Sequence, residues 1–264
     1  MIAKKVSLTL ICLCLFTISL VFIGQSSATI DKKTVVGMWL LNDGGGNTAK
    51  DSSGNKNDGT LIGKPKWIDG KFGKALEFEG TSGVEIDNPD NFDFLTWTYV
   101  FWFKAPIGGD FPNLIGRQFD NAHGWTFHLD PAGATFRIRI DSDGGINQWK
   151  TVPLNVRDDK WHYGAATQDD KANKVNLFID GIKGEQTYLG KYKNSGGFLK
   201  FALAAVGAVN FNGAIDDVAI FNTILSDDDI KAVMDNGLES AVGLAAVSSP
   251  GKLASTWGSI KSIR

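Results

Sequence analysis

Cysteine is nearly absent from this sequence: the 264 residues include only Cys12 and Cys14. Both lie in the first 28 residues, which have the pattern of a cleaved leader. The mature chain then has no cysteine, which excludes a disulfide framework and a thiol nucleophile. Histidine is also scarce, with three residues. These residues stand in no metal-ligand spacing, which argues against a zinc site. No G-x-S-x-G motif of a serine hydrolase and no phosphate-binding glycine motif is present.

The leader pattern covers residues 1–28. Lys4 and Lys5 precede an apolar run over residues 6–23, and Ser26 and Ala28 form a small-residue cleavage motif. We predict cleavage after Ala28 and a secreted protein, extracellular or at the cell surface, with no membrane insertion after cleavage. An uncleaved anchor is the alternative, because the apolar run is close to the roughly 18 residues that begin to resemble a spanning helix.

The mature chain also lacks an excess of positive charge. Removing Lys4 and Lys5 leaves 25 basic residues against 29 acidic ones, a formal charge of −4. This balance argues against a nucleic-acid partner and against attraction to an anionic membrane surface. We therefore expect the partner to be an extracellular glycan or protein.

Proline is rare, with 7 residues, whereas glycine is abundant, with 31, and clusters of Asn, Asp and Gly divide the chain into short apolar runs. This composition predicts an all-β sandwich or barrel. We expect one domain over residues 29–238 and a tail of small residues over 239–264, which we do not assign to the core. The predicted strands are residues 34–41, 60–63, 75–79, 83–86, 96–104, 114–118, 125–129, 135–140, 147–152, 161–168, 174–180, 201–206 and 214–221.

Two of these runs indicate which side chains face inward. Residues 96–104 are apolar on both faces, which predicts a central strand. In residues 135–140 the apolar Phe136, Ile138 and Ile140 alternate with Arg137 and Arg139, which predicts one buried and one polar face.

The segment from residue 211 to 237 predicts a strand followed by a helix. Asp216 and Asp217 interrupt the apolar run of the strand, and a carboxylate in a sheet is costly to desolvate. We therefore expect at least one of the two to face a cation, backbone donors or solvent. Ser226 and Asp229 have capping-box spacing, and Gly237 is placed to end the helix in a left-handed conformation.

A second polar segment, residues 42–59, follows the first predicted strand. It carries Asp43, Asp51, Asn55, Asn57 and Asp58 among glycines, so that many oxygens stand on a flexible backbone. Such a segment is a candidate cation site. The alternative is that its aspartates shape Asx-turns.

In this order the chain resembles the LamG-like jelly-roll domain, a branch of the concanavalin A-like lectin and glucanase superfamily. The matching blocks are KDSSGNKNDGTL (50–61), GKFGKALEFEG (70–80), FWFK (101–104), WHYGAAT (161–167), VNLFIDG (175–181) and FNGAIDDVAIFNTILSDDDI (211–230). The resemblance implies an antiparallel jelly-roll sandwich of two sheets, with the first and last strands adjacent. We add one short C-terminal helix to this fold.

The resemblance also implies a structural Ca²⁺ where the Asp51 loop would meet Asp216 and Asp217. We carry Asp51 and Asp216 over as side-chain ligands, with Asn57 and Asp217 beside them. Hard oxygens on a flexible loop suit calcium, which takes six to eight oxygen ligands.

For ligand binding, polar and aromatic residues over three successive predicted strands are the candidates. Sugar recognition needs an aromatic platform with planar polar neighbours. The candidate carbohydrate-binding residues are Trp125, His128, Arg137, Arg139 and Trp149. For each of them, a place in the core or on a solvated face is the alternative.

Catalysis is not expected. The glucanase branch of the superfamily places its acids in an E-x-D-x-x-E pattern, which the five glutamates of this chain do not form. We predict a secreted, non-catalytic binding module. A structural or adhesion component of the cell surface is the alternative, and a glycoside hydrolase is a third, weaker one.

Overall fold

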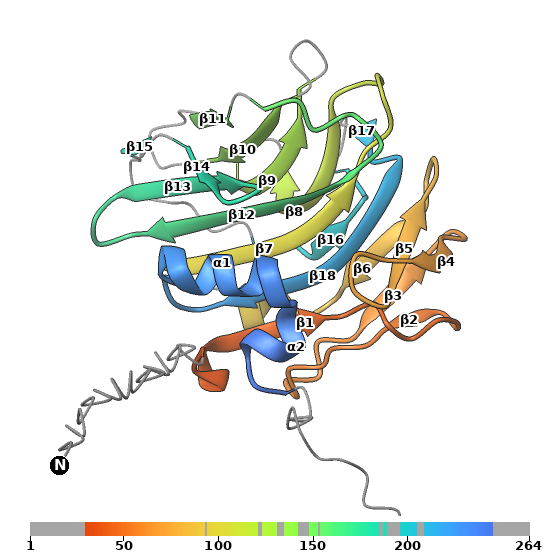
Figure 1. The fold of residues 1–264 in the computed structure, drawn as a ribbon, viewed down its shortest axis with the longest axis horizontal. Helices are drawn as coiled ribbons and strands as arrows, with labels where there is room; N and C mark the ends of the chain where they lie inside the picture. The colour runs from red at the N-terminus through yellow and green to blue at the C-terminus, as the bar shows by residue number, and fades with distance from the viewer. Residues whose placement is uncertain are drawn as a thin grey trace, which may run out of the picture.

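The short apolar runs fold into two antiparallel sheets that pack face to face, as Figure 1 shows for the computed structural model. The structure describes residues 30–92, 94–120, 123–130, 135–141, 148–152, 154–184, 187–188, 196–204 and 209–244. This architecture confirms the predicted jelly-roll sandwich. The predicted leader lies outside the described residues.

Sheet A has the strand order β14-β13-β12-β7-β18-β5-β4, with β1 also paired to β18 and β15 to β13. Its strands are β1 (Val35–Trp39), β4 (Lys66–Asp69), β5 (Lys74–Phe78), β7 (Trp97–Lys104), β12 (Trp161–Asp169), β13 (Lys174–Ile179), β14 (Ile182–Lys183), β15 (Thr187–Tyr188) and β18 (Gly213–Phe221). The pairing of β1 with β18 places the first and last strands side by side, as the resemblance implied.

Sheet B has the order β11-β10-β9-β8-β16-β6-β3-β2, and β17 pairs in parallel with β8. Its strands are β2 (Thr48–Ala49), β3 (Gly59–Ile62), β6 (Gly83–Ile86), β8 (Pro112–Asp120), β9 (His123–Leu129), β10 (Phe136–Ile140), β11 (Gln148–Val152), β16 (Leu199–Phe201) and β17 (Val209–Asn210). Two short 3-10 helices, η1 (Lys32–Thr34) and η2 (Pro89–Phe92), precede β1 and β7.

The main core fills the space between the sheets. Strand β7 lies between β12 and β18 and is buried over all but its last residue, which confirms it as a central strand. In β10, Phe136, Ile138 and Ile140 are buried while Arg137 and Arg139 point to the other face, as their alternation predicted. Large aromatic side chains dominate this core, among them Trp39, Trp97, Tyr99, Phe101, Phe103, Trp125, Phe127 and Phe136.

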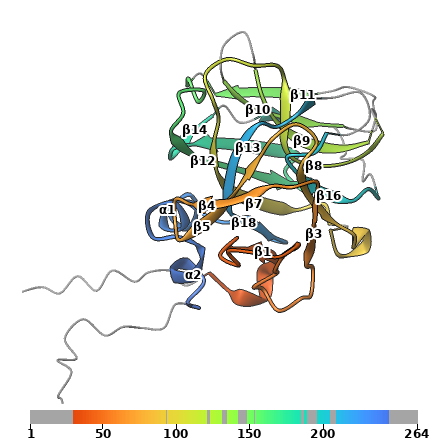
Figure 2. The ribbon, with the colours of Figure 1, turned by 90° about the vertical axis from the view of Figure 1, so that its right-hand side faces the viewer.

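The C-terminal segment covers the outer face of sheet A. Helix α1 (Asp227–Asn236) begins with the predicted capping box, in which Ser226 and Asp229 each accept from the other's backbone N–H. Figure 1 shows α1 lying across the sheet, and Figure 2 shows both helices on the side of the molecule away from β8 and β16. Ile230 and Val233 are buried in a second apolar cluster there.

Helix α1 ends with Gly237 as its C-cap, as predicted, and a second helix of four residues that was not predicted, α2 (Leu238–Ala241), follows at once. Gly237 has the expected positive φ of 78°, but its ψ of 163° is extended, so it redirects the chain into α2. Ala241 and Val242 are also buried in the second cluster, so the fold continues past the predicted tail boundary at residue 238. Residues 245–264 lie outside the described part.

Within the described ranges, no helix has both the length and the apolar character needed to cross a membrane.

Candidate functional site

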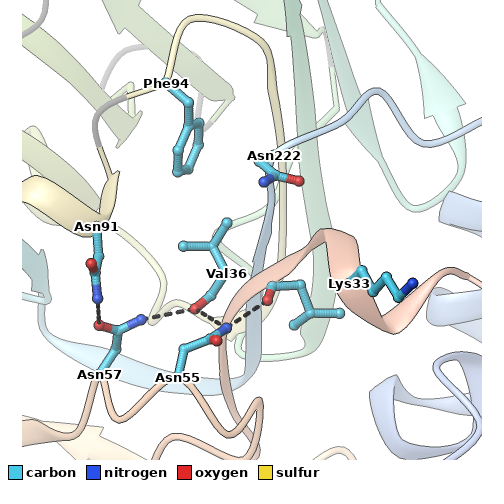
Figure 3. Close-up of a pocket in the computed structure, with 8 residues that line it drawn as sticks. Lys33, Val36, Asn55, Asn57, Asn91, Phe94 and Asn222 are labelled. Atoms are coloured by element: carbon cyan, nitrogen blue, oxygen red, sulfur yellow. Dashed lines mark hydrogen bonds between the residues drawn. The ribbon is translucent and has the colours of Figure 1, made fainter.

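An open groove lined by asparagines lies beside β1, with a volume of about 420 Å³. Asn55 and Asn57 come from the loop between β2 and β3, Asn91 from η2, and Asn222 from the residue after β18. Figure 3 shows Phe94 and Asn222 facing Asn55 and Asn57 across Val36. Among the described residues, the lining is Lys33, Val35, Val36, Asn55, Asn57, Asn91, Phe94 and Asn222, none of which carries a carboxylate.

The groove exists because the loop between β2 and β3 folds back over the outer edge of β1. One edge of β1 pairs with β18. On the other edge, Asp51 Oδ1 accepts from the Met38 N–H at 3.0 Å, and the Ser52 N–H donates to the Met38 carbonyl at 2.7 Å. Asn55 Nδ2 donates to the Val35 carbonyl at 2.8 Å. Side chains thus replace the partner strand that an exposed edge would otherwise attract.

Asn57 joins this loop to η2. Its Nδ2 donates to the Val36 carbonyl at 2.8 Å, while its Oδ1 accepts from Asn88 at 2.9 Å and from Asn91 at 2.8 Å. The side chain is buried, with 1% of the residue exposed. Because a buried carboxamide with all these bonds is rigidly held, Asn57 positions Asn91 at the groove.

Asp51 and Asn57, two of the predicted calcium ligands, are therefore occupied with backbone and amide donors. Asp51 Oδ1 also accepts from the Ser53 N–H, and its Oδ2 accepts from the Asn57 N–H, both at 2.9 Å. An oxygen surrounded by N–H groups has a positive environment, which is unsuited to a cation. The geometry matches the Asx-turn alternative.

The other two predicted ligands, Asp216 and Asp217, lie in a bulge of β18 where its register with β7 shifts. Asp216 accepts from the backbone N–H groups of Lys71 and Phe72 at 2.7 and 3.0 Å, and from that of Asp217 at 2.8 Å. Asp217 Oδ2 accepts from the Leu238 N–H at 3.2 Å, so it ties the bulge to α2. At least one of the pair was predicted to face a cation, backbone donors or solvent, and both accept from backbone donors.

These acids are almost fully buried, with 0% and 2% of the residues exposed. Burial raises the pKa of Asp216 to about 7, against three N–H donors that favour its ionised form. Burial and the charge of Asp216 raise the pKa of Asp217 to about 7. Asp217 has a single described acceptor bond, and its Oδ1 is buried without a partner among the described residues. We therefore place the proton of the pair on Asp217.

In the described residues, no group of three or more His, Cys, Asp or Glu side chains is arranged to hold a metal ion. Asp51 is bonded to β1 and the loop beside it, whereas Asp216 is bonded to the turn at Lys71. The four predicted ligands thus do not form one donor set, and their chemistry does not fit Ca²⁺. Calcium binding stays a prediction from the resemblance.

Trp125, the predicted aromatic platform, lies on the wrong face for that role. It is 1% exposed and packs between the sheets, with its ring centroid 4.1 Å from that of Tyr99. In β9 it stands in phase with Phe127 and Leu129, which are also in the core. A ring enclosed in this way has no face to offer a sugar.

His128, Arg137 and Arg139 do share the outer face of sheet B. His128 and Arg137 are direct partners in the β9–β10 ladder. His128 is 4% exposed, with its ring 5.0 Å from that of Phe111, and burial together with both arginines lowers its pKa to about 3.

The two arginines on this face are each paired with an acid. Arg137 pairs with Asp130, and Arg139 Nε donates to Asp141 at 3.1 Å. Trp149 is the ladder partner of Arg139, but its side chain lies outside the described residues. This face is therefore polar, partly covered and charge-balanced.

A further histidine, His162, has an environment opposite in charge to that of His128. His162 in β12 lies between two carboxylates, with Nδ1 2.7 Å from Asp180 and Nε2 2.8 Å from Asp158. Burial lowers its pKa, but the hydrogen bonds and charges of the two aspartates outweigh burial, so the pKa is raised overall.

A family model, Laminin_G_3, described as "Concanavalin A-like lectin/glucanases superfamily", matches residues 78–231. The chain belongs to this superfamily. The match confirms the resemblance that the sequence blocks indicated. A comparison with curated proteins finds no match.

Solved structures that are similar to this superfamily member include one named as a binding domain and two determined with a bound saccharide. The binding domain of Paraclostridial Mosquitocidal Protein 1 has a TM-score of 0.65 and 16% identity over 76% of this chain and 52% of that one. The chain thus spans about half of that structure. Domain 4 of AbnA, a GH43 extracellular arabinanase from Geobacillus stearothermophilus, in complex with arabinotriose, has a TM-score of 0.62 and 17% identity over 76% of this chain and 98% of that one.

A third similar structure is the Ruminococcus gnavus IT-sialidase CBM40 bound to alpha2,3 sialyllactose. Its TM-score is 0.53, with 17% identity over 60% of this chain and 95% of that one. At these identities the similarity is one of fold.

Proposed function

We propose that this protein is a secreted, non-catalytic binding module for an extracellular carbohydrate or protein. The observation that carries the proposal is the open groove beside β1, whose described lining residues combine carboxamides with one aromatic ring and include no carboxylate. Glycoside hydrolysis requires a pair of carboxylic acids at the bound sugar, which this lining does not supply. The binding domains with the same fold support the proposal by analogy.

The outer face of sheet B is the second contact surface in this proposal. Arg137 and Arg139 keep 28% and 13% of their side chains exposed and present planar guanidinium groups. Calcium is not part of the proposal, because the side-chain oxygens of the predicted ligands, except Asp217 Oδ1, already accept N–H groups.

A screen of the mature protein, residues 29–264, against immobilised glycans tests this function. We expect at least one glycan to be retained and then recovered unchanged, as measured by mass spectrometry. Shortened saccharides after incubation would contradict the non-catalytic assignment. Silence across the screen would favour the alternative, a structural or adhesion component that contacts protein.

A further inference from the structure

We infer that the asparagine-lined groove is a calcium-independent site for an uncharged, hydroxyl-bearing ligand of the neutral saccharide type. The inference rests on the proposed function and names its site, its ligand chemistry and its independence from metal. It follows from which atoms of the groove are already engaged and which remain for a ligand.

The carboxamides of the groove leave a defined set of hydrogen-bonding groups. Asn55 uses its Nδ2 on the Val35 and Val36 carbonyls, so its Oδ1 is the atom left for a ligand. Asn91 uses its Nδ2 on Asn57, which leaves its Oδ1 and a second N–H. The carboxamide of Asn222 makes no hydrogen bond within the described part of the chain. Hydroxyl groups both donate and accept, so they match this set of acceptors with a few donors.

The side-chain groups of the described lining argue against the two other small-ligand classes, cations and anions. A cation would find no carboxylate among the eight lining residues that the structure describes. An anion would face the Oδ1 atoms of Asn55 and Asn91, which are acceptors like itself. Lys33 lies at one end of the groove, with its side chain extended away from the asparagines (Figure 3). A neutral ligand is the class that remains.

The same geometry argues against an added peptide strand. Strand addition needs free carbonyl and N–H groups along a sheet edge. On β1 these groups are taken by the loop: Asn57 and Asn55 bind the carbonyls of Val36 and Val35, and Asp51 binds the Met38 N–H. A peptide backbone would have to displace all of them.

Phe94 completes the site as an apolar wall. Its ring is partly buried, packs against the main core and borders the groove opposite Asn55. Aromatic rings contribute contact area for the C–H faces of sugar rings while carboxamides bind the hydroxyls. The groove volume of about 420 Å³ is within the range of small-ligand sites.

The test uses arrays of neutral oligosaccharides and of uronic-acid oligosaccharides, each read with calcium and with EDTA. We expect neutral sugars to bind equally in both buffers. Asn222→Ala should weaken binding about three- to tenfold through the loss of one or two hydrogen bonds. Phe94→Ala should weaken it about tenfold. Matched controls are Asn236→Ala on α1 and Phe198→Ala, an exposed aromatic residue, and both should bind like the natural protein.

Three results would overturn the inference while leaving the binding function intact: loss of binding in EDTA, preference for uronic acids, or unchanged affinity in both groove variants. Affinity lost instead on Arg137→Ala would place the site on sheet B. No binding to any glycan in either buffer would overturn the inference together with the carbohydrate part of the proposed function. Thermal unfolding of each variant separates lost affinity from lost folding.

Discussion

Replacing Asp217 with Asn should make the protein more stable at neutral and alkaline pH. The side chain is buried in the β18 bulge beside Asp216, without a described cation partner. Asn has the same shape, keeps an oxygen for the Leu238 N–H and tolerates the positive φ of 46° at this position. The substitution therefore removes a buried charge and places an NH₂ group where Oδ1 has no described partner, a cost that does not change with pH.

The direction of the pH dependence of stability follows from the pKa of Asp217. Asp217 has a pKa of about 7 in the folded protein against an ordinary 3.8, so the folded state binds the proton more tightly. Its contribution to stability is fully present below about pH 4 and is lost as the pH rises through about 7. Three pKa units at about 1.4 kcal/mol each set a ceiling of about 4 kcal/mol, of which about 2–3 kcal/mol falls between about pH 5 and about pH 8.

Urea unfolding at a series of pH values measures this effect. The free-energy difference between Asp217→Asn and the natural protein should grow by about 2–3 kcal/mol from about pH 5 to about pH 8. Asp216→Asn is the control. Its carboxamide would turn an N–H toward backbone donors that now meet carboxylate oxygens, so it should destabilise at every pH. Equal pH slopes for the natural protein and Asp217→Asn would refute the reasoning.

Three further predictions concern other parts of the fold. NMR titration should show a pKa of the His162 ring above its ordinary value of 6.5, so that the stabilisation by this residue is complete below about pH 6.5 and is lost as the pH rises through the raised pKa. His128 should stay neutral down to about pH 3. A titration midpoint shared by the two rings would contradict the difference between their environments. Asp51→Ala should lower the free energy of unfolding by about 2–4 kcal/mol, through three lost backbone acceptor bonds, equally in calcium and in EDTA, and a calcium-dependent loss would restore the metal-site hypothesis. Gly70→Ala should cost about 1–3 kcal/mol in urea unfolding, because its Cβ would stand 2.5 Å from Asp216 Oδ2, and an unchanged midpoint would show that this turn can relax.

Much of the sandwich could be predicted from local patterns. The run at residues 83–86 became β6 with the predicted bounds, and the alternation in residues 135–140 correctly assigned both faces of β10. The capping box at Ser226 located the start of α1. These features depend on neighbouring residues, whose periodicity and capping chemistry are written in the sequence itself.

Except at Trp125, the errors arose where the face of a strand or the partner of a side chain depends on distant segments. The position of Trp125 was predictable, since it alternates in phase with Phe127 and Leu129. The prediction of a sugar-binding platform depended on its aromatic ring and not on this alternation. The asparagine groove was not predictable, because it joins the segment before β1, a loop after β2, η2 and the end of β18. The oxygens of Asp51 suggested calcium from the sequence, and only the fold shows that they face N–H groups.

The side chains that lie along β1 also bear on self-association of the protein through this strand edge. Bare carbonyls at Val35 and Val36 would let a strand of a second molecule pair with β1 and extend sheet A. The side chains of Asp51, Asn55 and Asn57 prevent this pairing, because they already bond to the backbone groups at the edge of β1. The loop that borders the groove therefore also blocks the edge of the sheet. Removing these side chains would enlarge the groove for a ligand, but it would also expose a strand edge that favours self-association.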